Sequence, residues 1–116
     1  MKIFGIICEY NPFHNGHARQ LEFCRSNGAD LIFCAMSGDF TQRGEPAVLE
    51  KRIRAKHAVQ SGADLVAELP LPYAAAGAKD FAEGGVKLLE KIGCTHICFG
   101  SECGNISLLE KAAELI

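Results

Sequence analysis

Two histidines near the start of the chain, His14 and His17, have a spacing that can do chemistry. They lie in the stretch CEYNPFHNGH, directly after an apolar run. Three roles are open to them. They can share a metal ion, with Glu9 as the nearest further ligand. They can cap the start of a helix, or they can donate hydrogen bonds to a phosphate group.

The residues around the two histidines favour the phosphate role. Pro12 stiffens the turn, and Gly16 lets the backbone come close to a ligand. A helix that begins here points its first amide groups back at the turn, where they stabilise an anion. Histidines at this place can strengthen their hydrogen bonds as charge builds on a leaving pyrophosphate. Such transfer relies on positioning and charge stabilisation, so it needs no covalent nucleophile.

The elements that must position the histidines alternate between strand and helix. Three times a helical stretch runs through a glycine into a short apolar segment, and Gly28, Gly62 and Gly93 are expected in the left-handed conformation past a helix end. The expected strands are residues 2–8, 30–36, 64–69 and 95–99. The expected helices are residues 17–26, 48–61 and 81–92, with another from residue 107.

This alternation predicts an α/β fold, a Rossmann-like doubly wound parallel sheet covered on both faces. In such a sheet, ligands bind beyond the carboxyl ends of the strands, where the strand order reverses. The histidine turn follows the first strand, and FGSE, residues 99–102, follows the fourth. We therefore expect these two segments to flank the binding site.

Composition excludes some classes of function. The 116 residues fit one domain, and 48% apolar residues are enough for one core. A net charge of −2 gives no overall attraction to nucleic acid or to an anionic membrane. No apolar run approaches the roughly 20 residues of a membrane span, and no leader opens the chain, so we expect a cytoplasmic protein without a membrane partner.

The six cysteines are expected to be small buried apolar residues. A disulfide framework is typical of small secreted scaffolds, which this chain does not resemble. A zinc cluster of Cys94, Cys98 and Cys103 is the alternative, although no Cys-x-x-Cys pair supports it.

Basic side chains supply further candidates. Arg43, in the loop SGDFTQRGEP, can hold a carboxylate or a phosphate with two parallel hydrogen bonds, unless this loop is only a surface connection. In the helix over 48–61, Ile53 and Val59 are expected on the apolar face, whereas the basic residues are expected mostly in solvent. Of these, Lys51 is the best placed to reach a triphosphate or RNA. Glu68, at the end of a strand, can meet a ligand or pair with a nearby arginine.

Four longer blocks carry a family resemblance. These are GIICEYNPFHNGHARQL, MSGDFTQRGEPAV, GADLVAELPLPYA and FGSECGNI. Together they resemble the bacterial tRNA(Met) cytidine acetate ligase family, a branch of the His-x-Gly-His nucleotidyltransferase superfamily. That superfamily usually has Thr or Ser near the place of Glu9. The resemblance implies activation of acetate with ATP, with Mg²⁺, to acetyl-adenylate and pyrophosphate. The acetyl group then passes to N4 of the wobble cytidine of elongator tRNA(Met).

The resemblance also implies roles for particular residues. The catalytic residues would be His14, His17 and Arg43. ATP would be bound by the stretch Ile7, Cys8, Glu9, Tyr10, Asn11, Pro12, Phe13, His14, Asn15, Gly16, His17, Ala18, Arg19 and Gln20, together with Gly100 and Ser101.

Members of the family are much longer than this chain, so residues 1–116 would be the ATP-binding domain, an amino-terminal part with most tRNA contacts elsewhere. Two other functions stay open. One is an adenylyltransferase acting on a small metabolite such as a phosphopantetheine or nicotinamide mononucleotide. The other is an ATP-binding module that has no turnover by itself, because the second phosphate-binding signature of the superfamily lies outside these residues.

Overall fold

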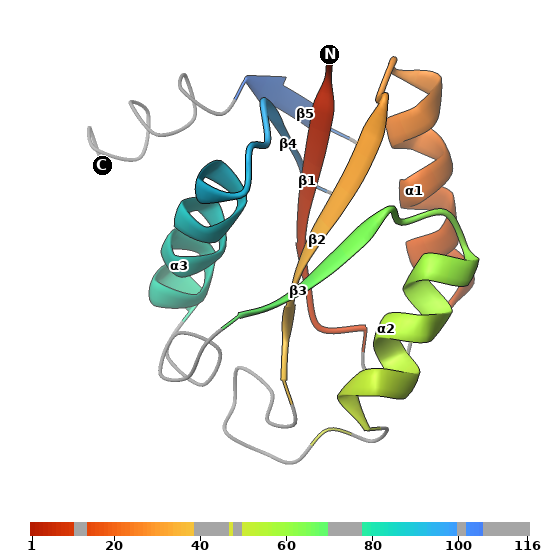
Figure 1. The fold of residues 1–116 in the computed structure, drawn as a ribbon, viewed down its shortest axis with the longest axis vertical. Coiled ribbons are helices and arrows are strands. Elements are labelled where there is room, and N and C mark those ends of the chain that lie inside the picture. Colours follow the sequence, from red (N-terminus) through yellow and green to blue (C-terminus); the bar gives the residue numbers. More distant parts are fainter. Residues whose placement is uncertain (11–13, 39–46, 48–49, 70–77, 100–101, 106–116) are drawn as a thin grey trace.

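The chain forms a sheet with helices on both faces (Figure 1). The structure, a computed structural model, describes residues 1–10, 14–38, 47, 50–69, 78–99 and 102–105. Its elements are β1 (Ile3–Cys8), α1 (Asn15–Ser26), β2 (Leu31–Ser37), α2 (Lys51–Gln60), β3 (Leu65–Leu69), α3 (Ala78–Lys91), β4 (His96–Phe99) and β5 (Glu102–Asn105). The helix predicted from residue 107 lies outside the described residues.

The strands lie in the order β3-β2-β1-β4-β5. The first four are parallel, and Ile6 of β1 lies in register with Cys34 of β2 and Cys98 of β4. The chain moves outward from β1 to β3 through α1 and α2, and α3 then leads back across the other face to β4 (Figure 1). The doubly wound parallel sheet predicted from the sequence is therefore confirmed. The sequence did not predict β5, which runs antiparallel to β4.

Side chains alternate between two cores, as a pleated strand requires. Phe4 and Ile6 of β1 join a cluster that contains Leu21 of α1. Ile7 points to the opposite face, where it packs against a second cluster that contains Leu89 of α3. Full burial of a side chain such as Leu21, which is 1% exposed, contributes about 1.5–3 kcal/mol.

Glycines allow α3 to lie close to β1. A Cβ atom on Gly5 would lie 2.8 Å from Cδ1 of Leu89, and one on Gly85 would lie 2.7 Å from Cδ1 of Ile7. Carbon atoms in contact normally lie about 3.5–4.0 Å apart, so neither position accepts a side chain without movement of its neighbour. The predicted left-handed glycines after the helices are also confirmed, with φ of +93°, +125° and +104° at residues 28, 62 and 93.

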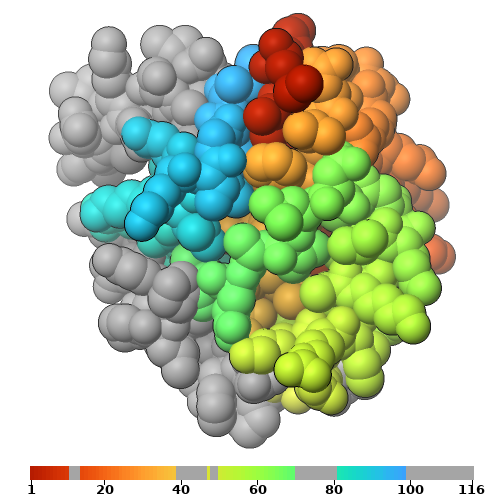
Figure 2. All heavy atoms as spheres, in the orientation of Figure 1, coloured from red at the N-terminus to blue at the C-terminus, as the bar shows by residue number. Residues whose placement is uncertain are grey.

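The orientation predicted for α2 is wrong. Ile53 and Val59 are 42% and 50% exposed, whereas Arg54 is fully buried. The small side chains of Ala55 and Ala58 pack against the core instead. The burial of Arg54 is possible because its guanidinium group donates hydrogen bonds to three backbone carbonyl groups. Figure 2 shows α2 and β3 side by side on the viewed face of the molecule.

Among the five cysteines whose side chains are described, four follow the prediction and one does not. Cys8, Cys24, Cys34 and Cys94 are buried free thiols. Burial raises the pKa of both Cys24 and Cys94 to about 11, so these thiols stay protonated. Cys98, by contrast, is disulfide-bonded. In the unpredicted strand β5, the Cα of residue 103 lies in register with that of Cys98.

Candidate functional site

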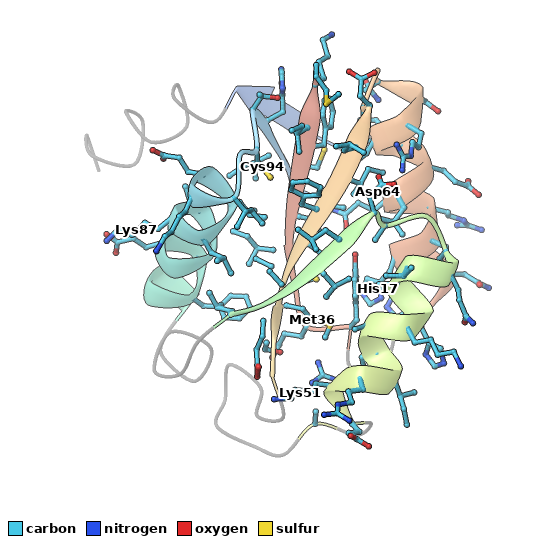
Figure 3. The ribbon with its side chains drawn as sticks, in the orientation of Figure 1. His17, Met36, Lys51, Asp64, Lys87 and Cys94 are labelled. Atoms are coloured by element: carbon cyan, nitrogen blue, oxygen red, sulfur yellow. The ribbon has the colours of Figure 1, made fainter. Side chains whose placement is uncertain are left out.

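The histidine turn lies where the fold predicts a ligand. β1 has β2 on one side and β4 on the other, so the strand order reverses at β1. The chain leaves the carboxyl end of β1 and enters α1 through this turn. Figure 3 shows that His17, Met36 and Lys51 lie at this end of the sheet, whereas Asp64 and Cys94 lie at the other end.

The two histidines cap α1 reciprocally. His14 is the N-cap residue, and its Nδ1 accepts a hydrogen bond from the Gly16 amide at 3.0 Å. Nδ1 of His17 accepts one from the His14 amide at 3.2 Å. Because an accepting ring nitrogen carries no proton, the neutral form of each ring has its proton on Nε2. The caps therefore leave each histidine with one N–H donor for another partner.

The histidine rings stack on each other, with centroids 3.7 Å apart and an angle of 22° between their planes. His17 also contacts the ring of Tyr10, at a centroid distance of 4.7 Å. Partial burial, with a smaller contribution from the charge of His14, lowers the pKa of His17. His17 is therefore a neutral hydrogen-bond donor at neutral pH.

Tyr10 supports His17 from the core side. Its side chain is 1% exposed, and its hydroxyl lies 3.6 Å from Sγ of Cys34. Burial raises the pKa of the phenol, which stays protonated. The backbone of Tyr10 has a φ of +49°, a left-handed conformation that is uncommon for residues other than glycine. This conformation lies just beyond the end of β1, at the residue whose ring contacts His17.

A cavity of about 650 Å³ opens beside this turn. Such a volume is within the usual range of sites for small molecules and cofactors. Its lining residues are Ile7, Cys8, Glu9, His14, Gly16, His17, Arg19, Gln20 and Phe23. All but Phe23 belong to the stretch predicted to bind ATP. Phe23 follows Gln20 by three residues on the same helix, and this spacing was the signal that could have identified it.

The electrostatics of the cavity suit an anion. The positive end of the α1 dipole faces this region, and the first turn of α1 contains no acidic residue. Arg19 adds a positive charge to the lining. Other predicted ligands cannot be placed, because residues 11–13, Arg43, Gly100 and Ser101 lie outside the described residues.

Two further candidates have structural partners. Nζ of Lys51 lies 2.9 and 3.1 Å from the two carboxylate oxygens of Glu68. Glu68 therefore has a structural partner, as one of its two predicted roles requires, but this partner is a lysine and not the expected arginine. At the other end of the sheet, Asp64 accepts hydrogen bonds from Arg25 at 2.5 Å and from the Ile32 amide at 2.8 Å, which joins α1, β2 and β3.

The described residues do not provide a metal site of their own. Within the described ranges, no group of three or more His, Cys, Asp or Glu side chains could hold an ion. Glu9 is the single carboxylate among the described lining residues. Also within those ranges, none of the helices is both long and apolar enough to cross a lipid bilayer.

Comparison with known proteins gives consistent matches along the whole chain. The sequence model of the HIGH Nucleotidyl Transferase family matches residues 1–116. The tRNA(Met) cytidine acetate ligase of Acetivibrio thermocellus is 52% identical over 118 residues, which are 100% of this chain and 28% of that protein. The ligase of Exiguobacterium sibiricum is 54% identical, over 98% of this chain and 30% of its own length.

A solved structure has the same fold. Thermotoga maritima TmcAL bound with alpha-thio ATP superposes with a TM-score of 0.86 and 44% identity, over 99% of this chain and 28% of that chain. The apo form of the same protein gives a TM-score of 0.85. This chain therefore spans less than a third of the length of these relatives.

Proposed function

Because the chain belongs to the HIGH nucleotidyl transferase family, we propose that it binds ATP in the cavity at the start of α1. The complete protein then activates acetate to acetyl-adenylate and transfers the acetyl group to N4 of the wobble cytidine of elongator tRNA(Met). One observation carries this proposal: the cavity and the histidine caps coincide in a chain that is 52% identical throughout to a tRNA(Met) cytidine acetate ligase. The ATP analogue in the T. maritima relative supports the choice of nucleotide.

The geometry suits adenylate formation. A carboxylate oxygen of acetate attacks the α-phosphate of ATP, the bond from that phosphorus to the bridging oxygen breaks, and pyrophosphate leaves with the electron pair. Nε2–H of His14 and of His17 would donate to the phosphate oxygens, and these bonds strengthen as negative charge develops. The start of α1 adds its dipole to the same charge stabilisation.

The remaining predicted ligands complete this proposal. Arg43 would hold the acetate carboxylate or a phosphate, and Gly100 and Ser101 would lie against the nucleoside. Mg²⁺ would be held mainly by the phosphates and by water, as is usual for this ion, and Glu9 is the carboxylate among the described residues that line the cavity. We propose a cytoplasmic location, where acetate, ATP and tRNA are available together.

The direct test uses the complete protein. Incubation with ATP, acetate and elongator tRNA(Met), followed by mass spectrometry of the digested tRNA, should detect N4-acetylcytidine. A reaction without acetate is the matched control. A folded protein that yields no acetylated nucleoside under these conditions would contradict the proposed reaction.

Two further measurements separate the alternatives. Release of pyrophosphate with acetate, but not with a phosphopantetheine or nicotinamide mononucleotide, distinguishes the ligase from a small-metabolite adenylyltransferase. The 116-residue chain spans 28% of its relatives, which favours nucleotide binding without turnover for this piece alone. Calorimetry of the piece with ATP should show binding, and a pyrophosphate assay should show no release.

A further inference from the structure

Arg54 is the buried charged side chain among the described residues, with 0% exposure. It lies in the first half of α2, whose neighbouring positions 52 and 53 face solvent. Burial of a charge is expensive unless hydrogen bonds satisfy it, so its partners indicate what it does.

The guanidinium group of Arg54 joins the ends of two neighbouring strands. Nη1 donates to the carbonyl oxygen of Glu9 at 2.5 Å and to that of Ser37 at 3.2 Å, and Nη2 donates to the carbonyl oxygen of Gly38. Glu9 is the first residue after β1, whereas Ser37 ends β2 and Gly38 follows it. One side chain of α2 therefore fastens the carboxyl ends of β1 and β2.

The β2 side of this junction has a second support. A Cβ atom on Gly38 would collide with the carboxylate of Glu68, so that carboxylate lies directly against the Gly38 backbone. Glu68 is held in turn by Lys51, which precedes Arg54 by three residues on α2. Two neighbouring basic residues on one helix face thus act on the same end of the sheet.

The β1 side of the junction leads to the histidines. Glu9 lines the cavity, and its carbonyl group, held by Arg54, belongs to the peptide unit that enters Tyr10. Tyr10 has the left-handed backbone conformation and supports the ring of His17. A rotation of the Glu9–Tyr10 peptide would therefore move Tyr10 and, with it, the support of the His17 ring.

We propose that Arg54 is a positioning residue for the histidine turn. It holds the Glu9 carbonyl group against the end of β2, which sets where Tyr10 turns the chain and where His14 and His17 stand beside the cavity. An ammonium group cannot replace it, because the planar guanidinium group donates along fixed, separate directions to carbonyl groups on two strands. The functional part of this inference rests on the proposed binding of ATP.

The test compares Arg54→Lys and Arg54→Met with Arg52→Met in the complete protein. Arg52 is exposed on the same helix and serves as the matched control. Hydrogen exchange without nucleotide reports on residues 8–17, and acetate-dependent pyrophosphate release gives kcat and KM for ATP. In both Arg54 variants, exchange over residues 8–17 should become at least tenfold faster, and kcat/KM for ATP should fall by about 10- to 100-fold. Arg52→Met should change neither.

Several results would overturn the proposal. Arg54→Lys with unchanged exchange, or with unchanged kcat/KM while the wild type is active, contradicts positioning. Exchange that accelerates equally over α2 and all strands, or an Arg54→Lys protein that does not fold, assigns Arg54 to general stability. If Arg54→Met fails to fold, Arg54→Lys alone decides. A wild type without pyrophosphate release refutes the proposed function, and the exchange comparison still decides whether Arg54 holds the turn.

Discussion

Helices α1 and α2 cover the same face of the sheet but differ in the large side chains that they bury (Figure 1). α1 buries Leu21 and Cys24 and leaves its charged residues in solvent. α2 buries Arg54 and exposes Ile53 and Val59. The difference shows that a helix beside the strand ends can be oriented by polar anchors rather than by its large apolar residues.

The starts of these helices differ in the same way. α1 begins with two histidines that cap it and line the cavity. The N-cap residue of α2, Glu50, makes no side-chain hydrogen bond to its helix. The start of α1 therefore has the features of the proposed ligand site, whereas α2 contacts the backbone at the ends of β1 and β2.

The largest expected effect is a difference in activity between a histidine variant of α1 and one of α2. His17→Ala in the complete protein should reduce the rate of acetate-dependent pyrophosphate release by about 10²–10³-fold, because one donor to the developing charge is lost. His57→Ala, on α2, should stay within about twofold of the wild type. Stopped assays of pyrophosphate release measure both. Full activity of His17→Ala would refute the phosphate role.

The apolar residues of the two helices should also differ in importance. Leu21→Ala should lower the free energy of unfolding by about 2–3 kcal/mol, because it leaves a cavity in the core. Ile53→Ala should lower it by less than about 1 kcal/mol, because that side chain is already 42% exposed. Urea unfolding followed by circular dichroism gives both values. Equal losses would show that α2 is packed through Ile53 after all.

The pH dependence of the free energy of unfolding should reflect the protonation of His17, which caps α1. Since folding lowers the pKa of His17 below its usual value of 6.5, the unfolded chain binds more protons between the two pKa values. The stabilisation is complete above pH 6.5 and is lost as the pH falls through the folded pKa, because protonated His17 can no longer accept from the His14 amide.

Urea unfolding of the wild type and of His17→Ala between pH 5 and 8 tests this sign. Wild-type stability should rise with pH across the lower part of this range, and the rise should be smaller in His17→Ala. An identical pH dependence in the two proteins would assign the effect to other groups.

The smallest expected effect lies at the end of β2, beneath α2. The hydroxyl of Ser37 is buried and has no hydrogen-bond partner among the described residues, although the Ser37 carbonyl group accepts from Arg54. Ser37→Ala should therefore leave the free energy of unfolding unchanged or raise it by up to about 1 kcal/mol. Thermal unfolding measures the change, and a clear loss of stability would reveal a partner for this hydroxyl.

The parallel sheet could be predicted from the sequence because its signals are local. A glycine past each helix end and a short apolar segment after it identify three helix-to-strand connections at residues 28, 62 and 93. β5 could not be predicted in this way, because its pairing with β4 depends on tertiary contact. The orientation of α2 failed for a related reason: the three carbonyl partners of Arg54 come from other elements.

The candidate site, like the sheet, could be predicted where the signals are local, and could not be predicted where they depend on tertiary contacts. The stretch from Ile7 to Gln20 contains most of the cavity lining, since one turn and one helix start bring these residues together. Tyr10 lies in the same core cluster as Phe4, Ile6 and Cys8, as strand alternation would place it, but the sequence could not show its left-handed backbone. Nor could it connect position 54 to position 9, which is 45 residues away.

The close approach of α3 to β1 has a consequence for variation in this protein. The side chain of Ile7 presses against Gly85 on the α3 side, and Ile7 is also among the residues that line the cavity. A single methyl group added at position 85 would displace Ile7, so substitution in α3 is constrained by its packing against β1, the strand that leads to the cavity.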